Sequence, residues 1–452
     1  MTNSADRISL KEKIGYSLGD AAANFIFQTL LALQLSFYTD TFGLTAAQAG
    51  TLFLVVGLGA ACLNPVMGVI ADRTTSRFGK FRPWLLWTAV PFGIISVLTF
   101  TTPHMSVGSK LAYAWITYTL LRVIYVVNNV PYASLMAVLS GDPDERNSIA
   151  SWRQIFANSV GFIVGSLAVP MVGYFGAGDS AKGYQWTMGI FSALCVVMFL
   201  IAFATTKERI QPDPGQKSSL ALDLSDLLKN GPWIALFLAT TCYFAAIVMR
   251  SGVMLQFFTY NAHNKLGFSW LNGFGLTSLL IGVTFSTPLS RRMGKRNLLI
   301  LSMVLTGVFN AALLFIPATA TVPIIATEVL RQFAYGWSCP IIWSMMADVA
   351  DYGEWKTGRR ATGTVTAAVV FALWAGLALG GAIAGWLFDA YGYVPNVEQT
   401  PRALQGILLT ASVYSALAFF ATALCMVFYP ITRAKNQEIS EELAARRKKY
   451  AH

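Results

Sequence analysis

Residues 184–205 read YQWTMGIFSALCVVMFLIAFAT and contain no charged side chain. A helix needs about 20 mostly apolar residues to cross the hydrocarbon core of a bilayer. This stretch therefore predicts a membrane-spanning helix. It is too continuously apolar for the strands of a membrane barrel, in which apolar and polar residues alternate over about 10 residues.

Stretches of the same kind recur along the whole chain. The 452 residues are 55% hydrophobic and 12% charged, whereas a typical soluble domain is about 25% charged. We expect an all-α membrane protein with twelve transmembrane helices, which excludes an ordinary cytosolic enzyme and a disordered chain. The predicted spans are 18–40, 47–70, 83–103, 112–138, 150–174, 184–205, 233–259, 268–290, 296–318, 321–346, 363–388 and 406–430.

Basic residues gather in every second connection between these spans. The opposite connections hold only Lys110, Lys182, Lys265 and Arg402. Cytoplasmic loops of membrane proteins are enriched in Lys and Arg, so we expect both termini to be cytoplasmic in a multi-pass protein of the cytoplasmic (inner) membrane. Topology thus accounts for the net charge of +11, and we expect no nucleic-acid partner.

The longest polar break, from about Lys207 to Gly231, divides the spans into two sets of six. We predict an N-terminal six-helix half (1–206), a cytoplasmic linker (207–231), a C-terminal six-helix half (232–432) and a basic cytoplasmic tail (433–452). The tail contains Arg446-Arg447-Lys448-Lys449, which predicts a juxtamembrane amphipathic helix attracted to anionic membrane lipids.

Corresponding loops of the two halves repeat a short pattern. Arg77-Phe78-Gly79-Lys80 follows the second span and Arg292-Met293-Gly294-Lys295 follows the eighth, which indicates a duplication. Two sets of six helices with such loops resemble the major facilitator superfamily, which binds substrate near the bilayer midplane between its halves and works by alternating access.

The loops after the fourth and tenth spans are acidic, so basic and acidic loops can pair and lock one conformation. The alternative is that these charges are solvated and serve topology alone. The candidates for such a conformational gate are Asp72, Arg73, Arg77, Lys80, Asp351 and Glu354.

A few charged side chains fall inside the predicted spans, where a charge costs several kcal/mol and marks a functional position. Glu328 and Arg331 are three residues apart and can neutralise each other, which leaves Asp20 against three arginines. Surplus arginine suits an acidic substrate, because guanidinium binds carboxylate or sulfonate bidentately. The alternative is that these arginines snorkel or bond backbone carbonyls. The charged side chains are Asp20, Arg122, Arg153, Arg250, Glu328 and Arg331.

The sequence offers no nucleophile–base pair, phosphate loop or metal-ligand spacing. We therefore expect neither an enzyme nor a bound cofactor or metal.

Five motifs, in order along the chain, are Lys13-Ile14-Gly15-Tyr16-Ser17-Leu18-Gly19-Asp20, Phe37-Tyr38-Thr39-Asp40, Gly79-Lys80-Phe81-Arg82-Pro83, Asn129-Val130-Pro131-Tyr132 and Asp351-Tyr352-Gly353-Glu354-Trp355. Together they resemble the glycoside–pentoside–hexuronide:cation symporter family, which includes the melibiose and glucuronide permeases. The resemblance covers nearly the whole chain. It implies import of a sugar or glycoside, usually driven by sodium ions or protons.

The resemblance also implies a sugar pocket at Asn24, Tyr125, Asn129, Arg153 and Trp343. Members of the melibiose type carry aspartates at the positions of Asn24 and Asn129. With two carboxylates fewer beside a retained Arg153, this pocket favours an acidic or less galactoside-like substrate. Further candidates for substrate binding are Arg122, Arg250 and Trp374.

The cation site of the family is altered. Typical members carry two aspartates on the second helix, where this chain has Ala60 and Asn64, and a lysine where it has Trp374. An alkali cation needs oxygen ligands and usually a carboxylate. We therefore favour proton coupling through Asp20 or Glu328, or uniport or exchange, over sodium coupling.

These observations predict a secondary transporter that imports a sugar or glycoside by alternating access, with a hexuronide or sulfonated sugar as the acidic option. Its partners would be that small molecule and membrane lipids. Two alternatives stay open: a carrier of amphipathic lipids or drugs, and a sugar sensor that does not transport.

Overall fold

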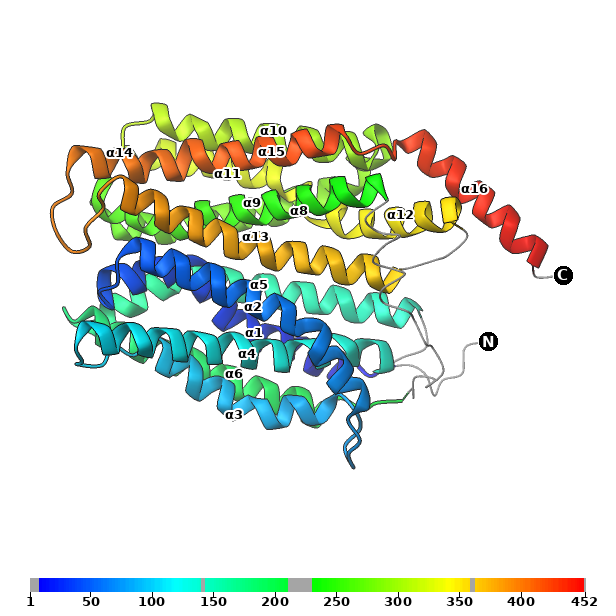
Figure 1. Cartoon of the computed structure of the whole chain (residues 1–452), viewed down its shortest axis with the longest axis horizontal. Coiled ribbons are helices and arrows are strands. Elements are labelled where there is room, and N and C mark those ends of the chain that lie inside the picture. The colour runs from blue at the N-terminus through cyan, green and yellow to red at the C-terminus, as the bar shows by residue number, and fades with distance from the viewer. Residues whose placement is uncertain (1–7, 140–142, 210–229, 358–361, 451–452) are drawn as a thin grey trace. The chain divides into compact units, whose positions relative to one another are not determined.

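The computed structural model describes residues 8–139, 143–209, 230–357 and 362–450. Within these ranges every regular element is a helix, as predicted. The chain divides into two compact units, Met1–Gln216 and Lys217–His452 (Figure 1).

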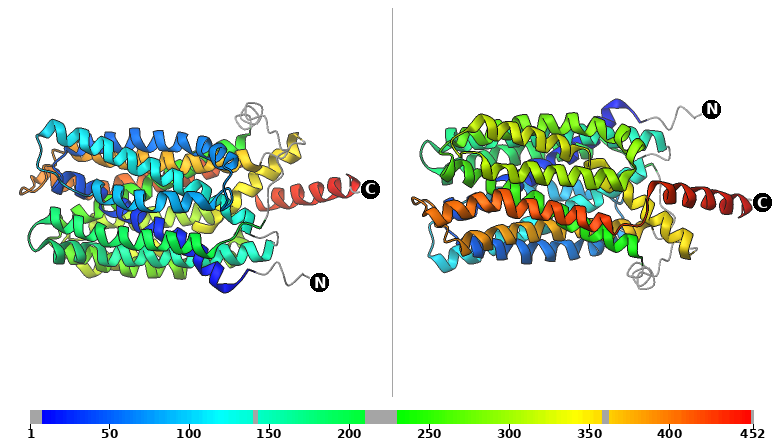
Figure 2. Two further views of the ribbon diagram at one scale, coloured as in Figure 1. Left: turned by 90° about the horizontal axis from the view of Figure 1, so that it is seen from below. Right: turned by 90° about the horizontal axis from the view of Figure 1, so that it is seen from above.

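The first unit is a bundle of long helices joined by short turns (Figures 1 and 2). Helix α1 packs along α5 and α6, whereas α3 packs against α4 and α6, and α2 packs against α4. The bounds are α1 Leu10–Ser36 with a π-helical end η1 Phe37–Thr41, α2 Ala46–Arg73, α3 Arg82–Thr99, α4 Val107–Leu139, α5 Pro143–Gly176 and α6 Ser180–Thr205.

The second unit repeats this plan with more interruptions. Helix α8 packs along α13 and α15, α9 along α11, and α10 along α15. The bounds are α8 Gly231–Gln256, η2 Phe257–Asn261, α9 Lys265–Met293, α10 Lys295–Ala312, η3 Leu313–Phe315, α11 Thr321–Gly336, α12 Cys339–Thr357, α13 Thr362–Ala390, α14 Pro401–Leu409, η4 Thr410–Tyr414, α15 Ser415–Val427 and α16 Arg433–Tyr450.

Among the described residues, ten helices are long and apolar enough to cross a membrane. The predicted spans 83–103 and 321–346 are not among them. Helix α3 is only 18 residues long and begins with Arg82 and Pro83. The stretch 321–346 is divided between α11, which has 16 residues, and α12, whose second half is polar.

The interruption between α11 and α12 has a local cause. Pro340 has no N–H, and its ring would collide with the carbonyl four residues earlier in a continuous helix. The chain therefore turns at Trp337 and Ser338. The Ser286 hydroxyl donates to the Trp337 carbonyl at 2.7 Å, and the Tyr243 hydroxyl lies 3.1 Å from the Ser338 hydroxyl. The first bond satisfies a backbone carbonyl at the turn, and the second joins the turn to α8 through two side chains.

The π-helical ends of α1 and α8 have the same pattern of hydrogen bonds. In η1 the Thr39 hydroxyl donates to the Leu35 carbonyl at 2.9 Å, and in η2 the Thr259 hydroxyl donates to the Leu255 carbonyl at 2.7 Å. The backbone bonds that close the two turns also correspond. The repeated pattern seen in the loops after the second and eighth predicted spans is thus accompanied by a second correspondence, at the ends of α1 and α8.

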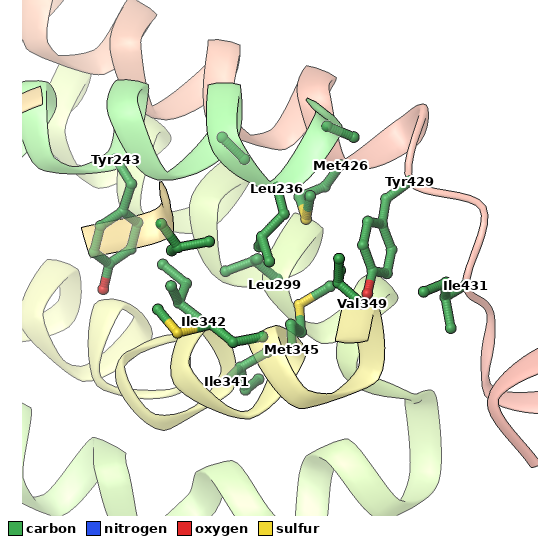
Figure 3. Close-up of a cluster of buried hydrophobic side chains, with 14 of the residues drawn as sticks. Leu236, Tyr243, Leu299, Ile341, Ile342, Met345, Val349, Met426, Tyr429 and Ile431 are labelled. Atoms are coloured by element: carbon green, nitrogen blue, oxygen red, sulfur yellow. The ribbon is translucent and has the colours of Figure 1, made fainter. Parts of the chain in front are cut away.

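Helix α12 is anchored in the second unit by an apolar core. Its buried side chains include Ile342, Met345 and Val349, which pack with Leu236 of α8 and Leu299 of α10 (Figure 3). At the far end of the core, the ring of Tyr429 reaches from the segment after α15 toward Val349 (Figure 3). This core fixes the acidic end of α12 relative to α10 and α15.

Candidate functional site

Polar residues on α1 form a ladder at four-residue spacing, so they share one helix face. The Asn24 amide nitrogen donates to the Asp20 carbonyl oxygen at 2.8 Å. The Gln28 amide nitrogen donates to Asn24 Oδ1 at 3.4 Å. The ladder places a carboxylate and two amides on a helix that otherwise crosses an apolar environment.

The ladder faces α5 through one ion pair. Arg153 Nε lies 3.9 Å from Asp20 Oδ2, and the two side chains are 33% and 19% exposed. A separation of 3.9 Å is longer than a hydrogen bond, so Arg153 and Asp20 form an ion pair without a direct bond, and Tyr16 is a further hydrogen-bond partner of Arg153. Asn24 and Arg153, both predicted to bind sugar, are thus linked through Asp20.

An aromatic pair holds α4 against this face of α1. The rings of Tyr16 and Tyr132 stack with centroids 4.6 Å apart, and each hydroxyl donates to the other residue's carbonyl, at 3.2 and 2.8 Å. A Cβ at Gly19 would lie 2.5 Å from the Tyr132 ring. Glycine is therefore required one residue before Asp20, a role that the motif alone did not reveal.

Helix α4 separates the two neighbouring asparagines. Asn128 is 2% exposed and donates to the Thr88 hydroxyl of α3 at 2.7 Å, so it is a packing contact. Asn129 lies about 100° further round the helix and is partly exposed. One turn earlier, the Tyr125 ring lies 5.9 Å from the Arg122 guanidinium.

The second unit contains a buried cluster of two arginines and one glutamate. Arg331 donates to both carboxylate oxygens of Glu328, through Nε at 2.9 Å and through Nη2. The expected contact between these two residues is therefore present. Arg250 of α8 also donates to Glu328, through Nη2 at 3.0 Å, so the arginines of the spans are less free than the sequence suggested.

Arg250 is 5% exposed, and its Nε and Nη1 are buried without a hydrogen-bond partner among the described residues. Burying such donors unpaired costs about 1–3 kcal/mol each, more for charged groups. The cluster carries a formal charge of about +1, because one carboxylate faces two guanidinium groups. An anionic hydrogen-bond acceptor placed beside Arg250 would therefore neutralise this cluster and satisfy its unpaired N–H donors.

The two tryptophans lie on different helices of the second unit. Trp343 of α12 is 51% exposed, whereas Trp374 of α13 is 9% exposed. An exposed indole face is available for stacking on a sugar ring, and Trp343 meets that condition better than Trp374. Asn24, Tyr125, Asn129 and Arg153 belong to the first unit.

The gate candidates are distributed over both units. Arg73 ends α2, and Arg77 and Lys80 lie in the turn before α3, with the Arg77 guanidinium 4.7 Å from the Phe78 ring. Asp351 and Glu354 lie on α12. The side chain of Asp72, and those of the basic tail residues 446–449, are outside the described side chains.

An acidic residue that the sequence analysis did not single out organises the turn before α3. The Glu208 carboxylate accepts from the backbone N–H groups of Lys80, Phe81 and Arg82 at 2.8, 2.8 and 2.9 Å. A carboxylate at a helix N-terminus satisfies otherwise unpaired donors and the helix dipole. Gly79 has φ +105°, and a Cβ there would lie 2.5 Å from Glu208 Cδ.

The residues next to Glu208 tie α6 to α1. Arg209 donates to both oxygens of Glu12, at 2.7 and 2.8 Å, and the Lys207 backbone N–H donates to the same carboxylate at 3.0 Å. The first residues of the predicted linker are therefore bonded to the first unit. No local motif marks these partners, because Glu12 and Arg209 are far apart in sequence.

The comparisons with known proteins agree with this architecture. A family model described as MFS/sugar transport protein matches residues 15–433. The inner membrane symporter YicJ of Escherichia coli is 35% identical over 97% of this chain and 95% of its own. The isoprimeverose transporter of Lactiplantibacillus pentosus is 35% identical over 95% of this chain and 90% of its own.

A glucuronide carrier protein homolog of Escherichia coli is 30% identical over 98% of this chain and 97% of its own. Among solved structures, the nucleoside transporter NupG superposes with a TM-score of 0.61 over 93% of this chain and 100% of its own, at 15% identity. That similarity supports the fold alone. On the family model and the full-length relatives, the chain belongs to the MFS/sugar transport protein family of multi-pass inner-membrane transporters.

Proposed function

We propose that the protein imports a sugar or glycoside as a secondary transporter, by alternating access between two six-helix halves with both termini in the cytoplasm. The family is described as MFS/sugar transport protein, and two full-length relatives are named as an inner membrane symporter and an isoprimeverose transporter, which are transport functions rather than enzymatic ones. The observation that carries the proposal is the polar face of α1, where Asp20, Asn24 and Gln28 form a hydrogen-bonded ladder against Arg153. Amides and a loosely paired guanidinium are suited to sugar hydroxyls.

The substrate in this proposal carries a carboxylate or sulfonate. Arg250 supports this, because its Nε and Nη1 are buried donors without a partner within the described ranges. A guanidinium binds a carboxylate through two parallel N–H bonds. The relative named as a glucuronide carrier homolog is a further reason to test acidic glycosides first.

Transport in this proposal is coupled to protons or uncoupled, and independent of sodium. At the altered cation position, the Asn64 amide nitrogen donates to the carbonyl oxygens of Ala60 and Ala61, at 3.0 and 3.2 Å. The amide offers one neutral oxygen, whereas an alkali cation site usually includes a negatively charged carboxylate. Glu328 is held by two guanidinium groups that stabilise its charged form, so Asp20, with one partner, is the better proton acceptor.

Ligand-induced thermal stabilisation of the purified protein tests this proposal. A ligand at 100 times its Kd stabilises the folded state by about 2.7 kcal/mol. Matched neutral, carboxylated and sulfonated glycosides are compared, and we expect the largest shift from the acidic members. Stabilisation by neutral glycosides alone would be consistent with a sugar transporter and would contradict the proposal that its substrate is acidic.

A pair of amide variants localises the binding. Asn129→Ala is expected to remove the shift, because Asn129 is placed at the sugar. Asn158→Ala is the control, since Asn158 accepts from the exposed Gln154 side chain at 3.1 Å. Equal loss in both variants, or stabilisation by amphipathic lipids or drugs instead of any sugar, would contradict the proposed function.

A further inference from the structure

A cavity of about 410 Å³ lies in the second unit, where α9 ends and α10 and α16 begin. It lies among residues to which sugar transport assigns no binding role. Cavities of about 300–1,000 Å³ are typical of small-molecule sites. The lining residues used below are Arg291, Gly294, Lys295, Asp348, Tyr429 and Arg433.

The equivalent place in the first unit shows what fits there. The Arg82 guanidinium donates to the Phe203 carbonyl near the end of α6, at 2.8 Å. Beside it, the backbone N–H groups of Lys80, Phe81 and Arg82, at and just before the start of α3, hold the Glu208 carboxylate. The first unit thus fills the N-terminus of its third helix with an anion from its own chain.

The second unit keeps the framework and lacks this anion. Arg296 donates to the Met426 carbonyl near the end of α15, at 3.1 Å, as Arg82 does to α6. Gly294 has φ +81°, and α10 begins there without a side-chain cap. A Cβ at Gly294 would lie 3.2 Å from the Cβ of Arg433, so a basic residue stands beside Gly294 where Glu208 stands beside Gly79 in the first unit.

A buried hydroxyl also points to a missing acceptor. Tyr429 lines the cavity and is 1% exposed, and its hydroxyl has no hydrogen-bond partner within the described part of the chain. A buried donor of this kind is normally satisfied by protein, water or ligand.

The charges of the lining leave room for an anion. Lys295 is neutralised by Asp348, to whose oxygens it donates at 2.8 and 2.7 Å. Of the other charged lining residues, Arg291 and Arg433 are basic and Asp351 is acidic. The lining as a whole therefore carries a net formal charge of +1. Helix N-termini flanked by basic side chains bind phosphate groups.

We propose that this cavity binds a phosphate group near the N-terminus of α10, between Arg291 and Arg433. The group is a phospholipid headgroup or free inorganic phosphate. Its binding would fix the start of α16 to α10 and so attach the tail helix to the bundle.

The test measures thermal stabilisation of the full-length, delipidated protein by two probes. Inorganic phosphate is compared with sodium chloride at equal ionic strength, and dioctanoyl phosphatidylglycerol with dioctanoyl phosphatidylcholine. We expect a rise in Tm of roughly 2 °C at ten times the Kd. A response to phosphatidylglycerol alone assigns the site to lipid, and a response to phosphate assigns it to the free ion.

Arg433→Glu places the chain's own carboxylate at α10, as Glu208 is placed at α3. It should weaken the response at least tenfold. Arg292→Glu makes the same change of charge at a neighbouring residue outside the cavity lining, and it should keep the wild-type response. If Arg433→Glu does not fold, the double variant Arg291→Gln, Arg433→Gln replaces it, and it should likewise weaken the response to the probe. Equal responses in the Arg433 and Arg292 variants, or no response of the wild type to either probe, would overturn the proposal.

Discussion

At the residue scale, the two units distribute their span charges alike. In the first, Asp20 faces Arg153; in the second, Glu328 lies between Arg250 and Arg331. Both sets pair one acid with arginine, but their burial differs. The side chains of the second set are at most 8% exposed, whereas that of Arg153 is 33% exposed.

Arg250→Lys tests the anion role. Lysine keeps the charge and loses the planar fork that binds two oxygens. Since hydrogen bonds to charged groups contribute about 1.5–3 kcal/mol, the affinity for acidic glycosides should fall roughly 10- to 100-fold, as measured by calorimetry. The affinity for neutral glycosides should change less than about twofold. Arg331→Lys is the control, because Glu328 already occupies that guanidinium; an identical profile for both variants would refute the assignment.

Gly79→Ala tests the Glu208 cap. An alanine in left-handed conformation costs about 1–2 kcal/mol, and here its Cβ would also displace the Glu208 carboxylate. Gly43→Ala isolates the first effect, because Gly43 has φ +90° and no neighbour within 4 Å of the added Cβ. We expect Gly79→Ala to lower the thermal midpoint clearly more than Gly43→Ala. Equal shifts would mean that Glu208 contributes little.

At the element scale, composition and continuous apolar runs were sufficient to predict a helical membrane protein, and paired loops were sufficient to indicate duplication. The break at Pro340 was missed because the apolar run continues through it. Glu208 was missed because a loop carboxylate that caps a helix more than a hundred residues away leaves no local pattern. Asn128 and Asn129 are equivalent in sequence, and only the rotation of α4 separates a packing amide from a sugar candidate.

The packing of α13 on α8 provides a test at this scale. A Cβ at Gly380 would lie 2.4 Å from the Ala245 carbonyl oxygen. Gly380→Ala should therefore push the helices apart and destabilise the protein by about 1–3 kcal/mol. Gly173→Ala on α5, where a Cβ would have no neighbour within 4 Å, should be neutral or stabilising by up to about 1 kcal/mol. Thermal midpoints in one detergent compare the two, and the reverse order would contradict the packing.

At the scale of the whole molecule, the proposed function includes coupling of transport to protons through Asp20. Proteoliposome uptake checks the coupling. A sodium gradient should leave the initial rate unchanged. An inward proton gradient should drive accumulation in the wild type and fail to do so in Asp20→Asn, which should still exchange substrate. Sodium-driven accumulation would contradict the loss of the cation site at Ala60 and Asn64.

The most direct test of transport itself is counterflow of a labelled glucuronide into proteoliposomes loaded with the same unlabelled compound, beside the matched neutral glucoside. The account predicts saturable counterflow of the glucuronide that Arg153→Ala abolishes. The contrary result is that both glycosides stabilise the protein but neither shows counterflow. The protein would then bind sugar without transporting it, which would contradict the proposed function.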